Sequence, residues 1–269
     1  MKHSRVYAVA LCGLALMLPV CFLKKESDEP TANLFVQLNS DSATMTAIRE
    51  AATIRINQIV KEELGLPADY DFSLFVPKER NRLTLYYFYD FPYSQQESLF
   101  TALAQLEGSV APKGAMITPE VDLFGEGGRE LVVMIDDSRG ELLQMHERVK
   151  AIAHELNDRY RQTHGRDLYN IAKSEEFAYK PHIGPGAIRL QSIKDRIQET
   201  ASARRSQGRR RDVILERIRS RIRETVTDEV VRPALAEGDA VLTFQQLSIF
   251  QLDPTRQVRA YIKDYVFGS

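Results

Sequence analysis

The chain has 269 residues, of which 43% are hydrophobic and 27% are charged, and its formal net charge is −1. This length can bury a full core, as one large domain or as two small lobes. The composition is that of an ordinary globular protein, and the balanced charge excludes a globally basic, nucleic-acid-binding chain.

Residues 1–25 are predicted to precede the folded domain. Lys2 and Arg5 lead into an apolar run of 18 residues, Val6 to Leu23, and a charged segment follows it. This layout is typical of a secretory signal peptide or a membrane anchor, and the run is close to the ~20 residues that span a bilayer. We therefore expect an exported protein, periplasmic or secreted, or one anchored through residues 6–23.

Both cysteines of the chain, Cys12 and Cys21, lie inside this run. The remaining body can therefore form no disulfide and has no thiol nucleophile, which suits an extracytoplasmic compartment. Cys21 follows Leu18-Pro19-Val20, which loosely resembles a lipid-attachment site, although Val20 is bulkier than the small residue expected there. A cleaved signal, a retained anchor and a lipoprotein attached at Cys21 remain alternatives.

Residues 26–32 are predicted to be a linker, and residues 33–269 the folded domain. Apolar periodicity and turn residues predict the elements of its first half. They are a strand over Asn33–Asn39, a helix after Ser40-Asp41-Ser42 to about Leu64, strands over Phe72–Val76 and Arg82–Phe88, and a helix from the capping box at Ser94 to about Glu107.

The second half repeats this order. It has strands over Met116–Phe124 and Glu130–Asp136, a helix from about Ser138 to Thr163, a short strand at His182, and terminal strands over 241–252 and 258–267. The glycine-rich turn at 125–128 is interpreted as a hairpin rather than a phosphate cradle, because no helix follows it.

Two similar halves therefore follow one another, each with short strands and helices set to one side. This order predicts an α+β fold. We expect a bilobal, pseudo-symmetric arrangement in which two antiparallel sheets flank a central cleft and the helices lie outside.

Two strands carry the candidate site. Residues two apart in a strand point to the same face, so Arg82, Thr84 and Tyr86 are predicted to project together. His182 and Gly184 share a face of the other strand in the same way. We expect the two strands to face each other across the cleft.

A pair of strands that each offer a His and a Thr two residues on is the signature of the 2H phosphoesterases. The chain resembles this superfamily of RNA 2′,3′-cyclic phosphodiesterases and 2′-5′ RNA ligase-like proteins from about Asn33 to Phe267. Arg82-Leu83-Thr84-Leu85 resembles the first motif, and Pro181-His182-Ile183 resembles the second.

The resemblance implies a mechanism in which two histidines share acid–base work and two hydroxyls hold the phosphate. It requires groups that titrate near neutral pH, and no metal or other cofactor. It implies that His182 is the catalytic residue, that Arg82, Thr84, Gly184 and Tyr86 bind substrate, and that the partner is a phosphate-containing ligand, a nucleotide or an RNA end.

The chain departs from the motif pattern twice, because Arg82 stands for the first histidine and Gly184 for the second hydroxyl. A guanidinium keeps its proton at ordinary pH, so Arg82 can grip phosphate but cannot serve as a base. Tyr86, Tyr179 and Lys180 are candidates to replace the lost group, although each is also interpretable as a packing aromatic or a solvated charge.

Residues 192–237 are predicted to be an arginine-rich helical insertion. Isoleucines and valines repeat every four positions and form one apolar stripe on a helix. The arginines could contact RNA phosphates or an anionic surface, or the helix could simply pack on the body with a solvated arginine face. The predicted contact residues are Arg209, Arg210, Arg211 and Arg217.

The sequence supports two main hypotheses of function. The first is a metal-independent cyclic phosphodiesterase that acts on or binds 2′,3′-cyclic phosphate RNA ends or small cyclic nucleotides, with catalysis impaired by Arg82 and Gly184. The second is a catalytically inactive, exported protein that binds nucleotide or RNA or serves as an interaction scaffold. Whether the chain is an enzyme stays open at this point.

Overall fold

The computed structural model describes residues 29–67, 69–70, 73–125, 127–201, 207–252 and 259–268, with the backbone alone at 200–201, 207–210 and 259. The chain divides into a unit Met1–Pro30 and a unit Thr31–Ser269. The predicted signal or anchor segment, Cys21 included, lies outside the described residues. Among the helices that are described, none is long and apolar enough to cross a membrane.

The first elements are those that the sequence predicts, although the second strand is shorter than expected and the third is longer. They are β1 (Thr31–Ser40), α1 (Ala43–Leu64), β2 (Phe75–Pro77) and β3 (Asn81–Pro92). The Ser42 hydroxyl accepts a bond from the Met45 N–H at the start of α1, and Gly65 ends the helix with a φ of 64°. Hydroxyl caps and left-handed glycines are the standard ends of a helix.

The next segment is less regular than predicted. Ser94 and Gln95 of the expected capping box lie in a 3₁₀ turn, Tyr93–Gln95, which has no side-chain cap, and the helix α2 begins at Gln96. It ends at Leu103 and is followed by a second 3₁₀ turn, Ala104–Leu106. Then come β4 (Ala115–Phe124), β5 (Glu130–Asp136), α3 (Glu141–His164) and α4 (Ile171–Ser174).

The last third carries β6 and the residues predicted to be an insertion. Its elements are β6 (His182–Ile188), α5 (Leu190–Ala201), α6 (Gln207–Val226), a π-helical turn (Thr227–Val231), α7 (Arg232–Glu237), β7 (Val241–Leu242), β8 (Phe244–Leu252) and β9 (Arg259–Val266). The hairpin predicted at residues 125–128 is confirmed, because β4 and β5 pair as antiparallel neighbours on either side of it.

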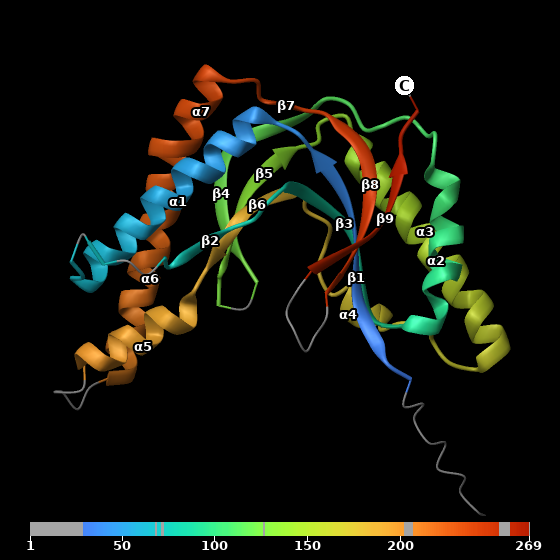
Figure 1. Ribbon diagram of the computed structural model, residues 1–269, viewed down its shortest axis with the longest axis horizontal. Coiled ribbons are helices and arrows are strands. Elements are labelled where there is room, and N and C mark those ends of the chain that lie inside the picture. Colours follow the sequence, from blue (N-terminus) through green and yellow to red (C-terminus); the bar gives the residue numbers. More distant parts are fainter. Residues whose placement is uncertain are drawn as a thin grey trace, which may run out of the picture. The chain divides into compact units, whose positions relative to one another are not determined.

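The strands form one continuous antiparallel sheet in the order β7-β4-β5-β6-β3-β1-β8-β9, with β2 beside β6 (Figure 1). The prediction of an α+β fold is confirmed, but the two separate sheets are not found. The halves are joined where Leu83 of β3 pairs with Ile183 of β6. The two predicted site strands therefore lie side by side and do not face each other from separate sheets.

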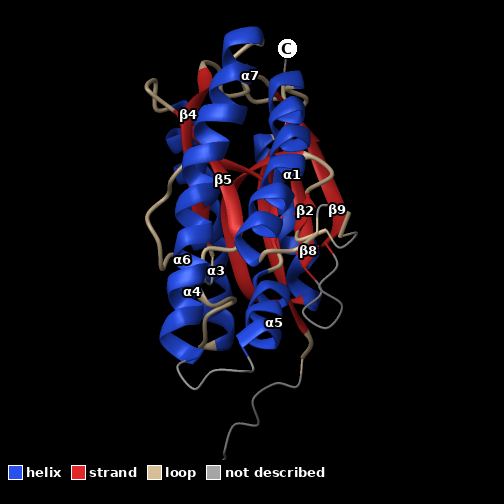
Figure 2. Cartoon of the chain, turned by 90° about the vertical axis from the view of Figure 1, so that its left-hand side faces the viewer, coloured by secondary structure: helices blue, strands red, loops and turns tan. Residues whose placement is uncertain are grey.

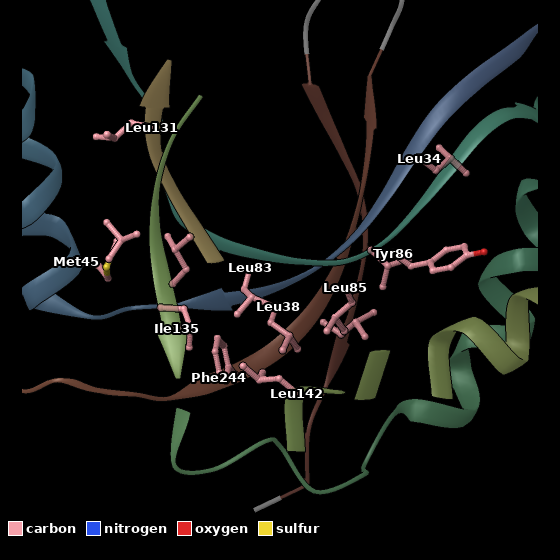
Figure 3. Packing of buried hydrophobic residues seen from close by; sticks show 14 of the residues in the cluster. Leu34, Leu38, Met45, Leu83, Leu85, Tyr86, Leu131, Ile135, Leu142 and Phe244 are labelled. Atoms are coloured by element: carbon pink, nitrogen blue, oxygen red, sulfur yellow. The ribbon is translucent and has the colours of Figure 1, made fainter. Parts of the chain in front are cut away.

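Two groups of helices flank the curved sheet from the outside (Figure 1). Within the unit Thr31–Ser269, α1, α5, α6 and α7 lie on one side, and α2 and α3 lie on the other (Figure 1). Figure 2 faces the first side and shows α1 and α6 in front of the strands. Buried side chains from both halves form the core, with Leu131 directed toward α1 and Leu83 and Leu38 near the centre (Figure 3).

The arginine-rich helix α6 is part of this covering layer. Its residues Ile218, Ile222 and Val226 are buried in the core. Arg221 forms ion pairs with Glu62 and Glu63 of α1. The arginine face of α6 therefore anchors the helix to the body in part, and the apolar stripe predicted from the sequence is its packing face.

We expect Ile222→Ala to lower the free energy of unfolding by about 2–5 kcal/mol, because it leaves a cavity in the core. Urea denaturation followed by circular dichroism measures this. Val213→Ala is the matched control, since Val213 lies on the same helix and is 67% exposed, and we expect it to change stability by less than about 0.5 kcal/mol. Equal, small effects would mean that α6 is an appended arm.

Candidate functional site

The motif positions meet where β3 and β6 pair. Leu83 pairs with Ile183, and both are fully buried. Extending this antiparallel register by one residue in each direction places Arg82 beside Gly184 and Thr84 beside His182. Since neighbours of a buried strand residue point to the opposite face, all four positions share the other face of the sheet. We call this face the cleft face.

Tyr86 does not belong to the cleft face. In the pairing of β1 with β3, Gln37 lies opposite Thr84 and Val36 opposite Tyr86, so Leu85 is an extra residue in β3. Such a β-bulge shifts the alternation by one. The prediction that Tyr86 projects with Arg82 and Thr84 is therefore wrong, and Tyr86 points into the opposite, helix-covered side (Figure 3).

The bulge gives the cleft face different aromatic residues. Tyr87 lies opposite Phe35, and their rings meet edge to face with centroids 5.1 Å apart. Tyr87 and Tyr89 stack with centroids 5.9 Å apart. The unbroken run Leu85-Tyr86-Tyr87-Phe88 hides the bulge in the sequence, because every residue in it is a good strand former.

Thr84 and Arg82 are held by partners on the neighbouring strands. The Gln37 side-chain amide donates to Thr84 Oγ1 over 2.7 Å, so the hydroxyl proton of Thr84 is directed elsewhere and can be donated to an anion. The Arg82 guanidinium carbon lies 3.8 Å above the centroid of the Phe250 ring. Stacking of this kind orients the planar fork of N–H donors that suits a phosphate.

A polar network extends the cleft face beyond Arg82. The Asn39 amide, opposite Arg82 in β1, donates to Ser248 Oγ over 2.6 Å, and the Ser248 hydroxyl donates to Asp264. These residues come from strands far apart in the sequence. No single stretch of the sequence signals them, so they are not predictable from it.

His182 is half-buried and its ring is fixed at one nitrogen. Its Nδ1 lies 2.7 Å from the Lys180 carbonyl oxygen, and its ring meets Phe124 edge to face with centroids 4.8 Å apart. Because a carbonyl can only accept, Nδ1 carries the proton, and Nε2 of the neutral ring has the lone pair. This is the tautomer that a general base needs.

The electrostatic surroundings favour neutral His182. Burial lowers the pKa of the imidazole below its ordinary value, and the nearby Lys78 ammonium lowers it further, against the opposing hydrogen bond to Lys180 and the charge of Glu130. His182 is therefore mainly uncharged at neutral pH and acts as a base more readily than as an acid.

Lys78 is a further residue of the site that the sequence does not reveal. It follows β2, and its ammonium forms an ion pair of 2.8 Å with Glu130. A Cβ atom built on Gly184 would lie 2.7 Å from Lys78 Nζ, so the ammonium occupies the space beside Gly184. The sequence shows only a charged turn between two strands at this place, and nothing there points back to Gly184.

The candidates to replace the lost acid–base group lie elsewhere. Tyr86 donates to Glu175 over 2.8 Å, and burial raises its pKa far above the ordinary value. Tyr179 stacks on His146 with centroids 4.2 Å apart, and burial raises its pKa in the same direction. Neither tyrosine gives up a proton near neutral pH. Lys180 is exposed, and its carbonyl is the group that touches His182.

Some of the arginines predicted to contact an anionic surface interact with carboxylates of the protein itself. Arg217 pairs with Glu63 over 2.5 Å. Arg211 lies 3.8 Å from Asp212, a distance at which an exposed pair contributes little. The side chains of Arg209 and Arg210 lie outside the described residues, so the predicted contact is untested there.

No family model matches the chain, and no curated protein matches its sequence. Solved structures do match. Usb1 from Kluyveromyces marxianus with uridine monophosphate has a TM-score of 0.50 at 11% identity, over 88% of this chain and 98% of that one. A second structure of the same Usb1 has a TM-score of 0.49 at 12% identity, over 85% and 96%. E. coli LigT complexed with 3′-AMP has a TM-score of 0.45 at 10% identity, over 89% and 100%.

The Usb1 structure that matches with a TM-score of 0.50 is that of a 2H phosphoesterase. At such low identity the likeness shows the fold alone. The chain therefore has the 2H phosphoesterase fold, as the sequence resemblance predicted. The roles of individual residues rest on the geometry described above.

We expect the imidazole of His182 to titrate below pH 6.5 in an NMR experiment, because burial and Lys78 disfavour its cation. Lys78→Met should raise the midpoint, since it removes a cation and leaves the Glu130 carboxylate. Lys113→Met, which alters an exposed lysine, is the control and should leave the midpoint unchanged. A midpoint above 6.5 in the unaltered protein would contradict the described surroundings of His182.

Glu175 ties the segment before His182 to α3. Burial by itself would raise the pKa of Glu175, but hydrogen bonds from His154, Tyr86 and Lys150 outweigh it and lower the pKa from 4.5 to about 2. The unfolded chain therefore takes up this proton first as the pH falls. The stabilisation is fully present above pH 4.5 and is lost toward pH 2.

Glu175→Gln should accordingly be less stable than the unaltered protein at pH 7, by on the order of 2 kcal/mol, and the gap should close between pH 4.5 and pH 2. Urea denaturation across this pH range measures it. Glu176→Gln alters the exposed neighbour and should show no such gap. A gap that does not change with pH would mean that the carboxylate charge of Glu175 is not what stabilises the fold.

Proposed function

We propose that the chain binds the phosphate of a nucleotide or an RNA end at the junction of β3 and β6, with weakened phosphodiesterase chemistry. The observation that carries this proposal is the Leu83–Ile183 pair, which sets Arg82, Thr84, Gly184 and His182 on one face. The fold is shared with Usb1, whose structure holds uridine monophosphate. A phosphate-containing nucleotide is therefore the ligand that fits best.

The geometry of each residue suits a particular role in binding or hydrolysing a phosphodiester. Arg82 offers N–H donors to one terminal phosphate oxygen, and Thr84 donates its hydroxyl proton to another. His182 Nε2 removes a proton from an attacking water. On a 2′,3′-cyclic phosphate, the water oxygen bonds to phosphorus while one ribose oxygen leaves and must gain a proton.

The site lacks a group that can supply this proton. The position that would supply it holds Arg82, which does not release a proton at ordinary pH. Loss of one acid–base group typically slows a reaction by about 10²–10⁴-fold. We therefore infer that hydrolysis of 2′,3′-cyclic phosphate ends or small cyclic nucleotides is slow, and that binding is the better preserved activity.

The second candidate is a protein without catalysis that is exported and binds nucleotide or RNA, or serves as an interaction scaffold. The absence of a proton donor at Arg82 favours it over an efficient enzyme. Export through residues 1–25, lipidation at Cys21 and a surface contact through Arg209, Arg210, Arg211 and Arg217 stay predictions. The surface contact can be tested by measuring the binding of RNA or of anionic vesicles to a variant that carries Arg209→Gln and Arg210→Gln.

Restoring the motif tests the proposal most sharply. Arg82→His with Gly184→Thr rebuilds the missing groups, but the new side chain at 184 would collide with Lys78 Nζ, which lies 2.7 Å from its Cβ position. The variant should therefore also carry Lys78→Ala. We expect it to hydrolyse 2′,3′-cyclic AMP about 10²-fold or more faster than the unaltered protein.

The control is the same triple variant with His182→Ala, which should lose the gain because the base is removed. Circular dichroism would verify that both variants fold. A folded triple variant with no gain in hydrolysis would contradict the placement of the four positions in one site. Failure of the unaltered protein to bind 3′-AMP, 2′,3′-cyclic AMP or inorganic phosphate would contradict the proposed function as a whole.

A further inference from the structure

We infer that Lys78 belongs to the phosphate site, and that together with Arg82 it makes this site select a dianionic phosphate monoester over a monoanionic cyclic diester. This inference rests on the proposed function. It names the ligand class, a nucleotide or RNA end that carries a terminal phosphate, and assigns that preference to a residue outside both motifs.

The backbone places Lys78 at the site. Strand β2 pairs with β6 over three residues, from Phe75 opposite Ile188 to Pro77 opposite Gly186. The Lys78 N–H then donates to the Pro185 carbonyl oxygen over 2.8 Å. Lys78 therefore starts from the edge of β6 directly beside the second motif, so its long side chain does not reach the site from a distant loop.

Gly184 and Lys78 fit each other. The ammonium lies where any side chain at 184 would begin, 2.7 Å from the position of a Cβ atom. A threonine there and the ammonium in its present place exclude each other. The hydroxyl that the motif pattern expects at this place is thus replaced by a cation from the residue that follows β2.

Glu130 holds the Lys78 ammonium in place but does not cancel the positive charge of the site. Its carboxylate pairs with Lys78 over 2.8 Å and belongs to β5, which pairs with the opposite edge of β6 from β2 and β3. An ammonium has three N–H donors and can bind a carboxylate and a phosphate oxygen together. Counting Arg82, Lys78 and Glu130 with neutral His182, the site carries one net positive charge.

The charge and the donors both suit a monoester. A phosphate monoester carries a charge of about −2 near neutral pH and three terminal oxygens, whereas a cyclic diester carries one charge and two such oxygens. Coulomb attraction scales with the ligand's charge. Arg82, Thr84 and Lys78 provide three anchors on the cleft face, one for each terminal oxygen of a monoester.

The test is calorimetric titration of the full chain with 3′-AMP, 2′,3′-cyclic AMP and adenosine at pH 7.5. We expect 3′-AMP to bind about tenfold tighter than the cyclic nucleotide, and adenosine to bind weakest. Lys78→Met should weaken 3′-AMP binding about tenfold and bring the two nucleotides close to equal affinity. Glu130→Gln should tighten 3′-AMP binding, because it removes a negative charge and retains the shape.

Lys113→Met is the matched control and should leave all three affinities unchanged. If both nucleotides bind, and Arg82→Gln weakens both, but Lys78→Met leaves their ratio unaltered, this inference is wrong and the proposed function stands. Equal affinity of the unaltered protein for both nucleotides also overturns it. If neither nucleotide nor inorganic phosphate binds, the proposed function and this inference are both overturned.

Discussion

The pairing of Leu83 with Ile183 is the contact on which the rest of the site depends. It is the point at which two halves of the sheet, each with its own covering helices, become one continuous structure. Burial of both side chains pins the register, because a slip of one residue would turn every neighbour to the wrong face. The same burial therefore forces Arg82, Thr84, Gly184 and His182 together on the cleft face.

Elements with regular periodicity were predictable from the sequence. The apolar stripe of α1, its cap at Ser42 and its end at Gly65 are local features, and the structure reproduces them. The long helix α3 and the β4–β5 hairpin were also within reach of local reasoning. The junction between the two halves was not predictable, because it depends on one pair of residues that lie 100 positions apart in the chain.

The candidate site was predictable only in part, for physical reasons. The alternation rule places Arg82 and Thr84 correctly but fails at Tyr86, because the bulge at Leu85 leaves no mark in a run of strand-forming residues. Lys78 was out of reach, since its role arises from the pairing of β2 with β6. A residue that reaches the site only through the tertiary structure leaves no periodic pattern in the sequence.

The close fit of Lys78 against Gly184 couples the two positions. A side chain at 184 requires the ammonium to leave its present place, 2.7 Å from the Cβ position, and the long lysine side chain can do so. A substitution at 184 therefore moves the charge of Lys78 as well as changing the shape of the site. Because the two residues are in contact, their substitutions are expected to have non-additive effects on binding.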